Sequence, residues 1–266
     1  MPSYLYDHLE KIKDTICKNE EFLLFLDYDG TLISFKDKPD KVFTPENTKK
    51  IIKNLAKINN INVFIITGRK LDNIKKLVDI NNVSYAALHG MQIEFRNEEN
   101  YLWPRAEKTQ PLIKEIKEKA YKEFKTDKEI ILEDKEYTLA FHYRMLPRGK
   151  IKVKTKNFLE IVKNIDKGEK LNIIKGDNVI ELRPYGWDKG NAVETIIDRK
   201  YNGKKILPIY IGDDTTDEDA FKTLNKTGIT VYVQNKSDLN TIAEYYLKNP
   251  DEVKNFLEKS FTSIIA

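Results

Sequence analysis

Short apolar runs that end abruptly at polar residues recur along the chain. The runs occupy residues 22–26, 61–66 and 206–211, and the residues that end them are Asp27, Thr67 and Gly212. Short, nearly continuous apolar stretches of this kind are typical of strands that are buried on both faces. The pattern therefore predicts three strands of one sheet, each followed by polar residues at its carboxyl end.

Apolar residues three or four positions apart lie before and between these runs, and this spacing predicts amphipathic helices. The residues are Leu5, Leu9, Ile12 and Ile16, then Ile51, Ile52, Leu55 and Ile58, and then Leu71, Ile74, Leu77 and Val78. The pair Thr44-Pro45 is a start signal for the second helix. Alternating buried strands and helices predict an α/β fold with a Rossmann-like parallel sheet core flanked by helices. In such a sheet, ligands bind beyond the carboxyl ends of the strands.

The middle of the chain has a different order of elements. A helical pattern at Ile113, Ile116, Ala120 and Phe124 precedes strand-like segments 129–133 and 137–143, and a second helical pattern within 154–165 precedes segments 171–175 and 178–182. The last two segments flank Gly176-Asp177, which is a hairpin signal. Helix, hairpin, helix, hairpin predicts a small α+β unit with an antiparallel sheet. We therefore predict a cap domain at residues 106–183, inserted into a core of residues 1–105 and 184–266.

Composition narrows the classes of function. The 266 residues are enough for a core and a smaller module. The 46 Lys+Arg against 42 Asp+Glu leave a net charge of only +4, spread along the chain, which does not favour nucleic-acid binding. A single cysteine, Cys17, excludes an internal disulfide and indicates a reducing compartment. The N-terminal segment is charged and the apolar runs are too short to cross a bilayer, so we expect a cytoplasmic protein without membrane contact. We also expect a monomer.

The first predicted strand ends in the sequence Asp27-Tyr28-Asp29-Gly30-Thr31. Two carboxylates two residues apart, where the chain leaves a sheet edge, are able to converge on one cation and one phosphate. Gly30 lets the backbone turn sharply and present N–H groups to an anion. Taken alone, these five residues are also compatible with a calcium-binding loop or an ordinary strand-end turn.

The second predicted strand ends in Thr67-Gly68-Arg69. A hydroxyl group at this position is able to donate a hydrogen bond to a phosphate oxygen. In isolation, a helix cap before residues 70–79 explains the threonine equally well. Thr67 is therefore a candidate for the site only in combination with the other segments.

Acidic residues gather where the third predicted strand ends. Asp213, Asp214 and Asp217 lie within five residues, and carboxylates this close repel one another unless a hard cation lies among them. The dipole of the following helix accounts for Asp217 but not for the other two at the end of a buried strand. The pattern therefore favours a metal site.

A lysine stands at the start of a further predicted helix. Asp188 is a natural N-cap, and Lys189 follows it in the first turn, where a positive charge opposes the helix dipole. Local conflicts of this kind tend to occur at functional positions. A surface lysine in a lysine-rich chain is the alternative explanation.

These four segments occur in the order of the four motifs of the haloacid-dehalogenase-like hydrolases, which are D-x-D-G-T, a Ser/Thr after the second strand, a Lys and a terminal acidic pair. The sequence resembles this class along its whole length. The resemblance implies that Asp27 is the nucleophile that forms an aspartyl-phosphate and that Asp29 is the general acid and base. It also implies that Thr67 orients the phosphoryl group and that Lys189 neutralises charge between the nucleophile and the phosphate.

The cofactor that this resemblance implies is Mg²⁺. Its implied ligands are Asp27, the backbone carbonyl of Asp29 and Asp213, with Asp214 and Asp217 bound directly or one shell further out. The implied phosphate contacts are Gly30, Thr31, Gly68 and Arg69. Mg²⁺, the lysine and the loop N–H groups together would offset a repulsion of about 4 kcal/mol between two unit charges 4 Å apart at an effective dielectric constant of 20.

Several segments are more specifically similar to trehalose-6-phosphate phosphatases. They are residues 133–144, 181–184 and 212–221, and the pair His89-Gly90. The sugar contacts implied by this similarity are Glu133, Lys135, His142, Arg144 and Glu181, with His89 and Gly90. We expect His142 and Arg144 to lie on the same strand face. Cross-strand charge pairs on a small sheet are the alternative explanation for any one of these residues.

The sequence thus predicts a phosphatase that converts a small-molecule sugar phosphate, trehalose 6-phosphate, to trehalose and phosphate in trehalose biosynthesis. Gln92 stands where many members of the family have an acidic residue, so sucrose phosphate, glucosylglycerol phosphate and mannosyl-3-phosphoglycerate stay open as substrates. A non-hydrolysing sugar-phosphate sensor and a mutase or phosphotransferase are the alternatives from other classes. Four residues argue against a sensor, namely Asp27, Asp29, Lys189 and Asp213.

Overall fold

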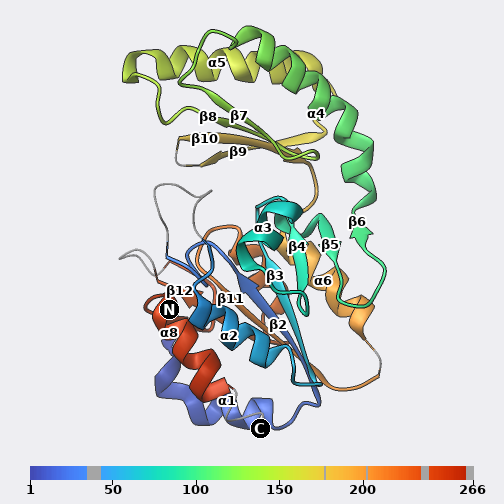
Figure 1. Cartoon of the computed structure of the whole chain (residues 1–266), viewed down its shortest axis with the longest axis vertical. Coiled ribbons are helices and arrows are strands. Elements are labelled where there is room, and N and C mark those ends of the chain that lie inside the picture. The colour runs from blue at the N-terminus through green and yellow to red at the C-terminus, as the bar shows by residue number, and fades with distance from the viewer. Residues whose placement is uncertain (35–42, 177, 202, 235–239, 262–266) are drawn as a thin grey trace. The chain divides into compact units, whose positions relative to one another are not determined.

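The chain divides into two units in the computed structural model, which describes residues 1–34, 43–176, 178–201, 203–234 and 240–261 (Figure 1). The larger unit consists of Met1–Tyr101 and Trp187–Ala266, and the smaller unit consists of Leu102–Gly186. The smaller unit contains the segment 106–183 for which the sequence predicts a cap.

The larger unit is built on a mixed sheet with the strand order β1-β13-β12-β11-β2-β3-β4-β5-β6. Its strands are β1 (Ser3–Tyr4), β2 (Glu21–Asp27), β3 (Ile61–Ile66), β4 (Ser84–Ala87), β5 (Gln92–Glu94), β6 (Tyr101–Leu102), β11 (Ile206–Gly212), β12 (Ile229–Val233) and β13 (Tyr245–Leu247). The first seven strands of this order, from β1 at the edge through β13, β12, β11, β2 and β3 to β4, are all parallel to one another. The strand β5 then pairs with β4 in the antiparallel direction. The predicted parallel sheet is confirmed, and its three apolar runs become the adjacent strands β11, β2 and β3.

Helices flank this sheet (Figure 1). They are η1 (Leu5–His8), α1 (Leu9–Ile16), α2 (Glu46–Leu55), α3 (Leu71–Val78), η3 (Leu88–Gly90), α6 (Lys189–Lys200), α7 (Asp217–Leu224), α8 (Pro250–Asn255) and η4 (Phe256–Phe261). The single N-terminal helix expected from the apolar spacing is divided into η1 and α1, because His8 leaves helical geometry with a φ of −123°. Within the described ranges, none of the helices combines the length and the apolar character needed to cross a bilayer.

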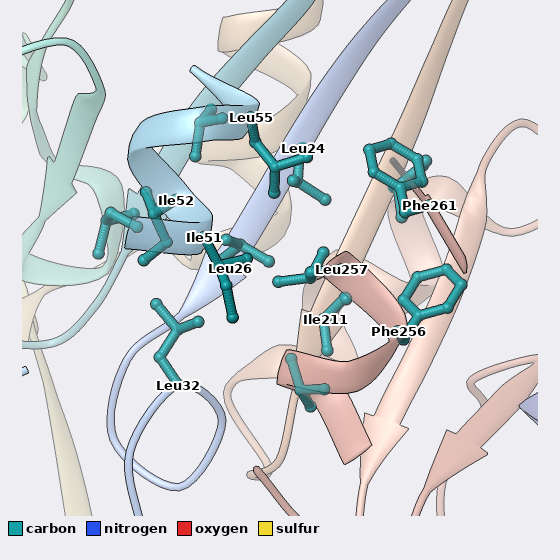
Figure 2. Close-up of a cluster of buried hydrophobic side chains, with 14 of the residues drawn as sticks. Leu24, Leu26, Leu32, Ile51, Ile52, Leu55, Ile211, Phe256, Leu257 and Phe261 are labelled. Atoms are coloured by element: carbon teal, nitrogen blue, oxygen red, sulfur yellow. The ribbon is translucent and has the colours of Figure 1, made fainter. Parts of the chain in front are cut away.

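The core of the larger unit explains why its strands are apolar on both faces. On one face, Leu24 and Leu26 of β2 belong to an apolar cluster with side chains of α2 and of the C-terminal helices α8 and η4 (Figure 2). On the other face, the Phe25 ring stacks between Phe64 and Tyr210, with ring centroids 5.3 Å and 6.0 Å away. Because alternate residues of β2 enter two separate apolar layers, the strand has no exposed face and its sequence is a continuous apolar run.

The smaller unit contains an antiparallel sheet with the order β7-β8-β10-β9 and two helices. The elements are α4 (Pro104–Glu123), β7 (Ile131–Asp134), β8 (Leu139–His142), α5 (Arg148–Ile165), β9 (Leu171–Gly176) and β10 (Val179–Pro184). Side chains of both helices pack on one face of the sheet in a core that includes Ile113, Phe141, Phe158 and Leu182. The predicted order of helix, hairpin, helix, hairpin is present.

One detail of the predicted hairpin is wrong. The strand expected at 137–143 ends at His142, and the chain then turns, with the Leu146 N–H donating to the Tyr143 carbonyl at 3.1 Å before α5 begins. Arg144 therefore lies exposed in this turn and does not share a strand face with His142. At the second hairpin, Asp177 lies outside the described residues.

The two-sided core of β2 generates a stability prediction. Leu24→Ala should lower the free energy of unfolding by about 3 kcal/mol, because Leu24 is fully buried and the smaller side chain leaves a cavity. Ile242→Ala, at a side chain that is 58% exposed, should change it by no more than about 0.5 kcal/mol. Urea unfolding followed by circular dichroism measures both, and equal stabilities for the two variants would contradict the packing described.

Candidate active site

Three strand ends meet at one edge of the larger sheet. Asp27 pairs with Ile66, which precedes Thr67, and β11 pairs with β2 as far as Ile211, two residues before Asp213. Since these strands are parallel, their carboxyl ends lie at the same edge. The sheet thus brings together three of the predicted site segments from distant parts of the chain.

A buried ammonium group connects two carboxylates at this edge. Lys189 Nζ donates to Asp27 Oδ1 and to Asp217 Oδ1, both at 2.7 Å, and the lysine side chain is 2% exposed. Lys189 is the first residue of α6, whose N-cap Asp188 forms a capping box with Asn191. The two carboxylates offset the unfavourable interaction of the lysine with the helix dipole.

Burial governs the protonation of these groups. It raises the pKa of Asp27 well above its ordinary value, an effect that Lys189 opposes and that Asp217 and Asp213 reinforce. Burial alone would lower the pKa of Lys189, but Asp217 and Asp27 outweigh it and hold that pKa well above its ordinary value. The shared contact thus favours the charged form of Lys189, whereas burial and the neighbouring carboxylates disfavour the charged form of Asp27.

The acidic cluster fits a divalent metal ion. Asp27, Asp213 and Asp217 are buried, and each offers one oxygen within 4.8 Å of the others. Two unit charges at that separation repel by about 3.5 kcal/mol at an effective dielectric constant of 20. Three carboxylates and the Lys189 ammonium (−3 and +1) leave two negative charges, which one divalent cation neutralises. Oxygen ligands of this kind suit hard cations such as Mg²⁺.

The loop after β2 packs directly against Asp213. Thr31 Oγ1 donates to Asp213 Oδ1 at 3.1 Å. Gly30 has a φ of +93°, and a Cβ atom there would lie 2.3 Å from Asp213 Oδ2. Only glycine therefore allows this backbone to turn and to approach the carboxylate so closely.

Arg69 holds the carboxylate of Asp29. Its Nε donates to Oδ2 at 2.6 Å and its Nη2 donates to Oδ1 at 2.7 Å, which is a bidentate pair. Its Nη1 donates to Asn73 Oδ1 at 3.1 Å, and its backbone N–H donates to Thr67 Oγ1 at 3.2 Å. The N-cap of α3 is Lys70, so Thr67 does not cap this helix.

His89 lies against the turn that contains Gly68. A Cβ atom on Gly68 would be 2.7 Å from His89 Nε2, so the glycine makes room for the imidazole ring. His89 is buried in a left-handed conformation, with its N–H donating to the Thr67 carbonyl at 2.8 Å. Its own carbonyl accepts a hydrogen bond from Trp187 Nε1 at 3.1 Å. Together with Gly90 at the end of η3, these residues extend the group at the sheet edge.

Two further residues complete the described site. Asp214 is exposed, and its Oδ1 accepts from the N–H and the Oγ1 of Thr216, so it does not join the metal-competent group. Sequence reasoning missed Tyr210, whose hydroxyl donates to Asp217 Oδ1 at 2.6 Å. Burial, reinforced by Asp217, raises the pKa of Tyr210 well above its ordinary value. The available signal was a hydroxyl in a strand buried on both faces, which needs a partner.

A polar face lies on the smaller sheet, opposite its apolar core. We define it as Glu133, Lys135, His142 and Glu181. Ala140 pairs with Glu133 on one side and Glu181 on the other, whereas its neighbours Leu139 and Phe141 enter the core. Since successive side chains of a strand point to opposite faces, the two carboxylates lie in one row on the polar face.

Charge pairs organise this polar face. Lys135 Nζ donates to Glu181 Oε1 at 2.9 Å, and His142 Nε2 lies 3.0 Å from Glu133 Oε2. Burial alone would raise the pKa of Glu133, but the His142 hydrogen bond and the charge of Lys135 lower it below its ordinary value. The polar face thus combines four of the five predicted sugar contacts of this unit, and Arg144 is not among them.

Solved structures of other proteins share this fold. A haloacid dehalogenase-like hydrolase from Bacteroides thetaiotaomicron aligns with a TM-score of 0.62 at 17% identity, over 90% of this chain and 99% of that one. The C-terminal domain of a trehalose-6-phosphate phosphatase from C. albicans aligns with a TM-score of 0.79 at 21% identity, over 98% of this chain and 99% of that one. The architecture is therefore that of the haloacid-dehalogenase-like hydrolases.

Sequence comparison identifies the family within this class. The family model described as trehalose-phosphatase matches residues 25–251. Trehalose-phosphate phosphatase B of Arabidopsis thaliana is 32% identical over 255 residues, which cover 91% of this chain and 67% of that protein. The chain belongs to the trehalose-phosphatase family, and it is a phosphoric monoester hydrolase.

The contact between Gly30 and Asp213 generates a prediction. Gly30→Ala should lower turnover of an aryl phosphate about a hundredfold, because the added methyl group displaces the loop or the carboxylate from its place in the site. Gly203→Ala is the matched control, since Gly203 also has a positive φ, +86°, but nothing within 4 Å of the added Cβ. Similar losses in the two variants would show that backbone strain alone is responsible and would contradict the steric account.

Proposed function

We propose that this protein is a magnesium-dependent phosphatase that hydrolyses trehalose 6-phosphate to trehalose and phosphate. The observation that carries the chemistry is the Lys189 ammonium group shared between Asp27 and Asp217 at the edge of the sheet. Family membership and the relatives named trehalose-phosphate phosphatase support the substrate. Trehalose biosynthesis is the process in which this reaction would take part.

The proposed reaction has two steps, and each exchanges one bond to phosphorus. In the first, a carboxylate oxygen of Asp27 bonds to phosphorus while the bond from phosphorus to the sugar oxygen breaks, and Asp29 gives that oxygen its proton. In the second, Asp29 takes a proton from water, whose oxygen bonds to phosphorus and releases Asp27. One water molecule is consumed, and one residue acts first as acid and then as base.

The remaining residues of the edge reduce the repulsion between the carboxylate and the phosphate. Lys189 offers its charge to the phosphoryl oxygens, Thr67 offers its hydroxyl, and the loops at Gly30-Thr31 and Gly68 offer backbone N–H groups. Bound Mg²⁺, held by Asp27, the Asp29 carbonyl and Asp213, would supply two further positive charges for phosphoryl transfer. This donor set agrees with the two negative charges left over in the cluster.

Arg69 takes a more specific part in this proposal than the sequence predicts. Its bidentate pair with Asp29 fixes the direction of both carboxylate oxygens, and Asn73 in turn holds the guanidinium group. Arg69 is therefore proposed to orient the Asp29 carboxylate in addition to contacting the phosphate. His89 and Gly90 remain proposed substrate contacts because they border the Thr67 turn.

The polar face is proposed to recognise sugar hydroxyls. Glu133 and Glu181 provide charged acceptors, and Lys135 provides charged donors, which form hydrogen bonds stronger than those between neutral groups. Their mutual pairing holds the side chains in fixed directions before any ligand arrives. Preorganised groups lose less entropy on binding, which favours selection of one disaccharide over its relatives.

Cellular location and oligomeric state stay predictions from composition. The exposed, unpaired thiol of Cys17 agrees with a reducing compartment such as the cytoplasm. A monomer without nucleic-acid or membrane partners is proposed on the same compositional grounds.

The proposed function predicts an order of substrates. Trehalose 6-phosphate should be hydrolysed faster than sucrose 6-phosphate, mannosyl-3-phosphoglycerate or glucose 6-phosphate in the presence of Mg²⁺, and chelation of the metal should abolish turnover. Phosphate release measures each rate, and a higher rate on another member of the series would overturn the substrate assignment.

Asp27→Asn should lower kcat about ten-thousandfold or more, because the amide does not form the covalent bond. Appreciable residual turnover would contradict Asp27 as the nucleophile.

The polar face predicts a separation of sugar recognition from phosphate chemistry. Lys135→Ala should raise the KM for trehalose 6-phosphate about tenfold, the effect of losing one charged hydrogen bond, and should leave hydrolysis of p-nitrophenyl phosphate within about twofold. Lys117→Ala is the matched control, since Lys117 pairs with Asp134 at 2.7 Å on the helix-covered side of the same sheet. Equal losses on both substrates, or equal effects of both variants, would show that the polar face does not bind the sugar.

A further inference from the structure

Asp217 differs from the other carboxylates of the site because protein groups already donate to both of its oxygens. Oδ1 accepts from Lys189 Nζ at 2.7 Å and from the Tyr210 hydroxyl at 2.6 Å. Oδ2 accepts from the backbone N–H groups of Asp213 and Asp214, each at 3.0 Å. A carboxylate has about four acceptor positions. In Asp217, which is fully buried, protein donors occupy them all.

Tyr210 is the donor in this set that nothing in the proposed reaction uses. Its ring stacks on Phe25 with centroids 6.0 Å apart and meets Phe221 edge-on at 5.6 Å. The residue is fully buried in β11. Because packing fixes the ring on two sides, the direction of the hydroxyl, and hence the place of Asp217 Oδ1, is fixed as well.

The direction of a lysine ammonium group depends on fixed acceptors more than that of an arginine guanidinium group does. The Lys189 ammonium group is a compact charge on a flexible stem with three N–H donors. Among the described residues, Asp27 and Asp217 accept from two of these donors, and the third is proposed to donate to an oxygen of the phosphoryl group. The direction of that last N–H follows from where the two carboxylates stand.

We propose that Tyr210 is a positioning residue of the phosphatase site, which acts through Asp217 to set the direction in which Lys189 presents its ammonium group. The inference rests on the proposed function. In this arrangement Asp217 is an orienting group one shell away from the metal ion, and the inner carboxylate ligands are Asp27 and Asp213. The hydrogen bond of the Tyr210 hydroxyl goes to Asp217, so Tyr210 would act on Lys189 through that carboxylate.

Tyr210→Phe tests the inference, because it removes one hydroxyl and keeps the ring. With the holoenzyme and trehalose 6-phosphate, kcat should fall about tenfold, as expected for loss of one hydrogen bond to a charged group. KM and the Mg²⁺ concentration for half-maximal activity should stay within about twofold, since neither the sugar contacts nor the inner ligands change. A general loss of stability would not produce this separation of kcat from the other two constants.

Tyr85→Phe is the matched control. Tyr85 is also a buried strand tyrosine, and its hydroxyl donates to the Ile80 carbonyl at 2.6 Å, outside the site. It should lower the melting temperature about as much as Tyr210→Phe and leave kcat unchanged.

The outcomes separate this inference from the proposed function. Absence of turnover in the unaltered protein contradicts the proposed function. Turnover in the unaltered protein together with an unchanged kcat in Tyr210→Phe overturns the inference alone. A rise in the Mg²⁺ requirement of Tyr210→Phe in proportion to its loss of kcat also overturns it, because Asp217 would then be an inner ligand of the metal.

Discussion

The arrangement of the site depends on one lysine ammonium group that is withdrawn from water. Burying such a charge costs several kcal/mol unless well-placed opposite charges accompany it. Lys189 meets this requirement with carboxylates from the end of β2 and the start of α7, while the lysine itself begins α6. Three elements that are distant in sequence must therefore be in place together, and the parallel order of β11, β2 and β3 is what brings them there.

The same lysine does not balance the site electrically. Two negative charges remain at the sheet edge. Burial raises the pKa of Asp27, and the neighbouring carboxylates reinforce this shift. An anionic substrate would add to this excess, so a divalent cation would favour both the ionised form of Asp27 and the approach of a phosphate. The close contact of Gly30 with Asp213 shows how tightly the backbone surrounds this charge. Stability and chemistry thus depend on the same few contacts.

In the smaller unit, successive side chains along each strand alternate between the apolar core and the polar face. Phe141 and Leu182 enter the core beneath the helices, while Ala140 and Glu181 lie in the row of the polar face. The pair of Lys135 and Glu181 is the cross-strand charge pair that the sequence offered as an alternative to sugar binding. The two explanations do not exclude each other, because the ion pair also fixes the directions of two charged side chains on the polar face. Arg144 does not belong to the polar face, because β8 ends before this residue and the chain then turns towards α5.

The parallel sheet and the residues that follow its strands were predictable from the sequence, because a strand buried on both faces leaves an unbroken apolar run. The sequence also indicated the type of chemistry, since few functions require carboxylates, a hydroxyl and a lysine at successive strand ends and helix starts. The pairing of these groups, in contrast, became known only from the folded chain. That Asp217 is held by Tyr210 and Lys189, and Asp29 by Arg69, depends on contacts between segments far apart in the chain. Spacing along a sequence carries no record of such contacts, because they arise from the register of neighbouring strands and the packing of side chains around them.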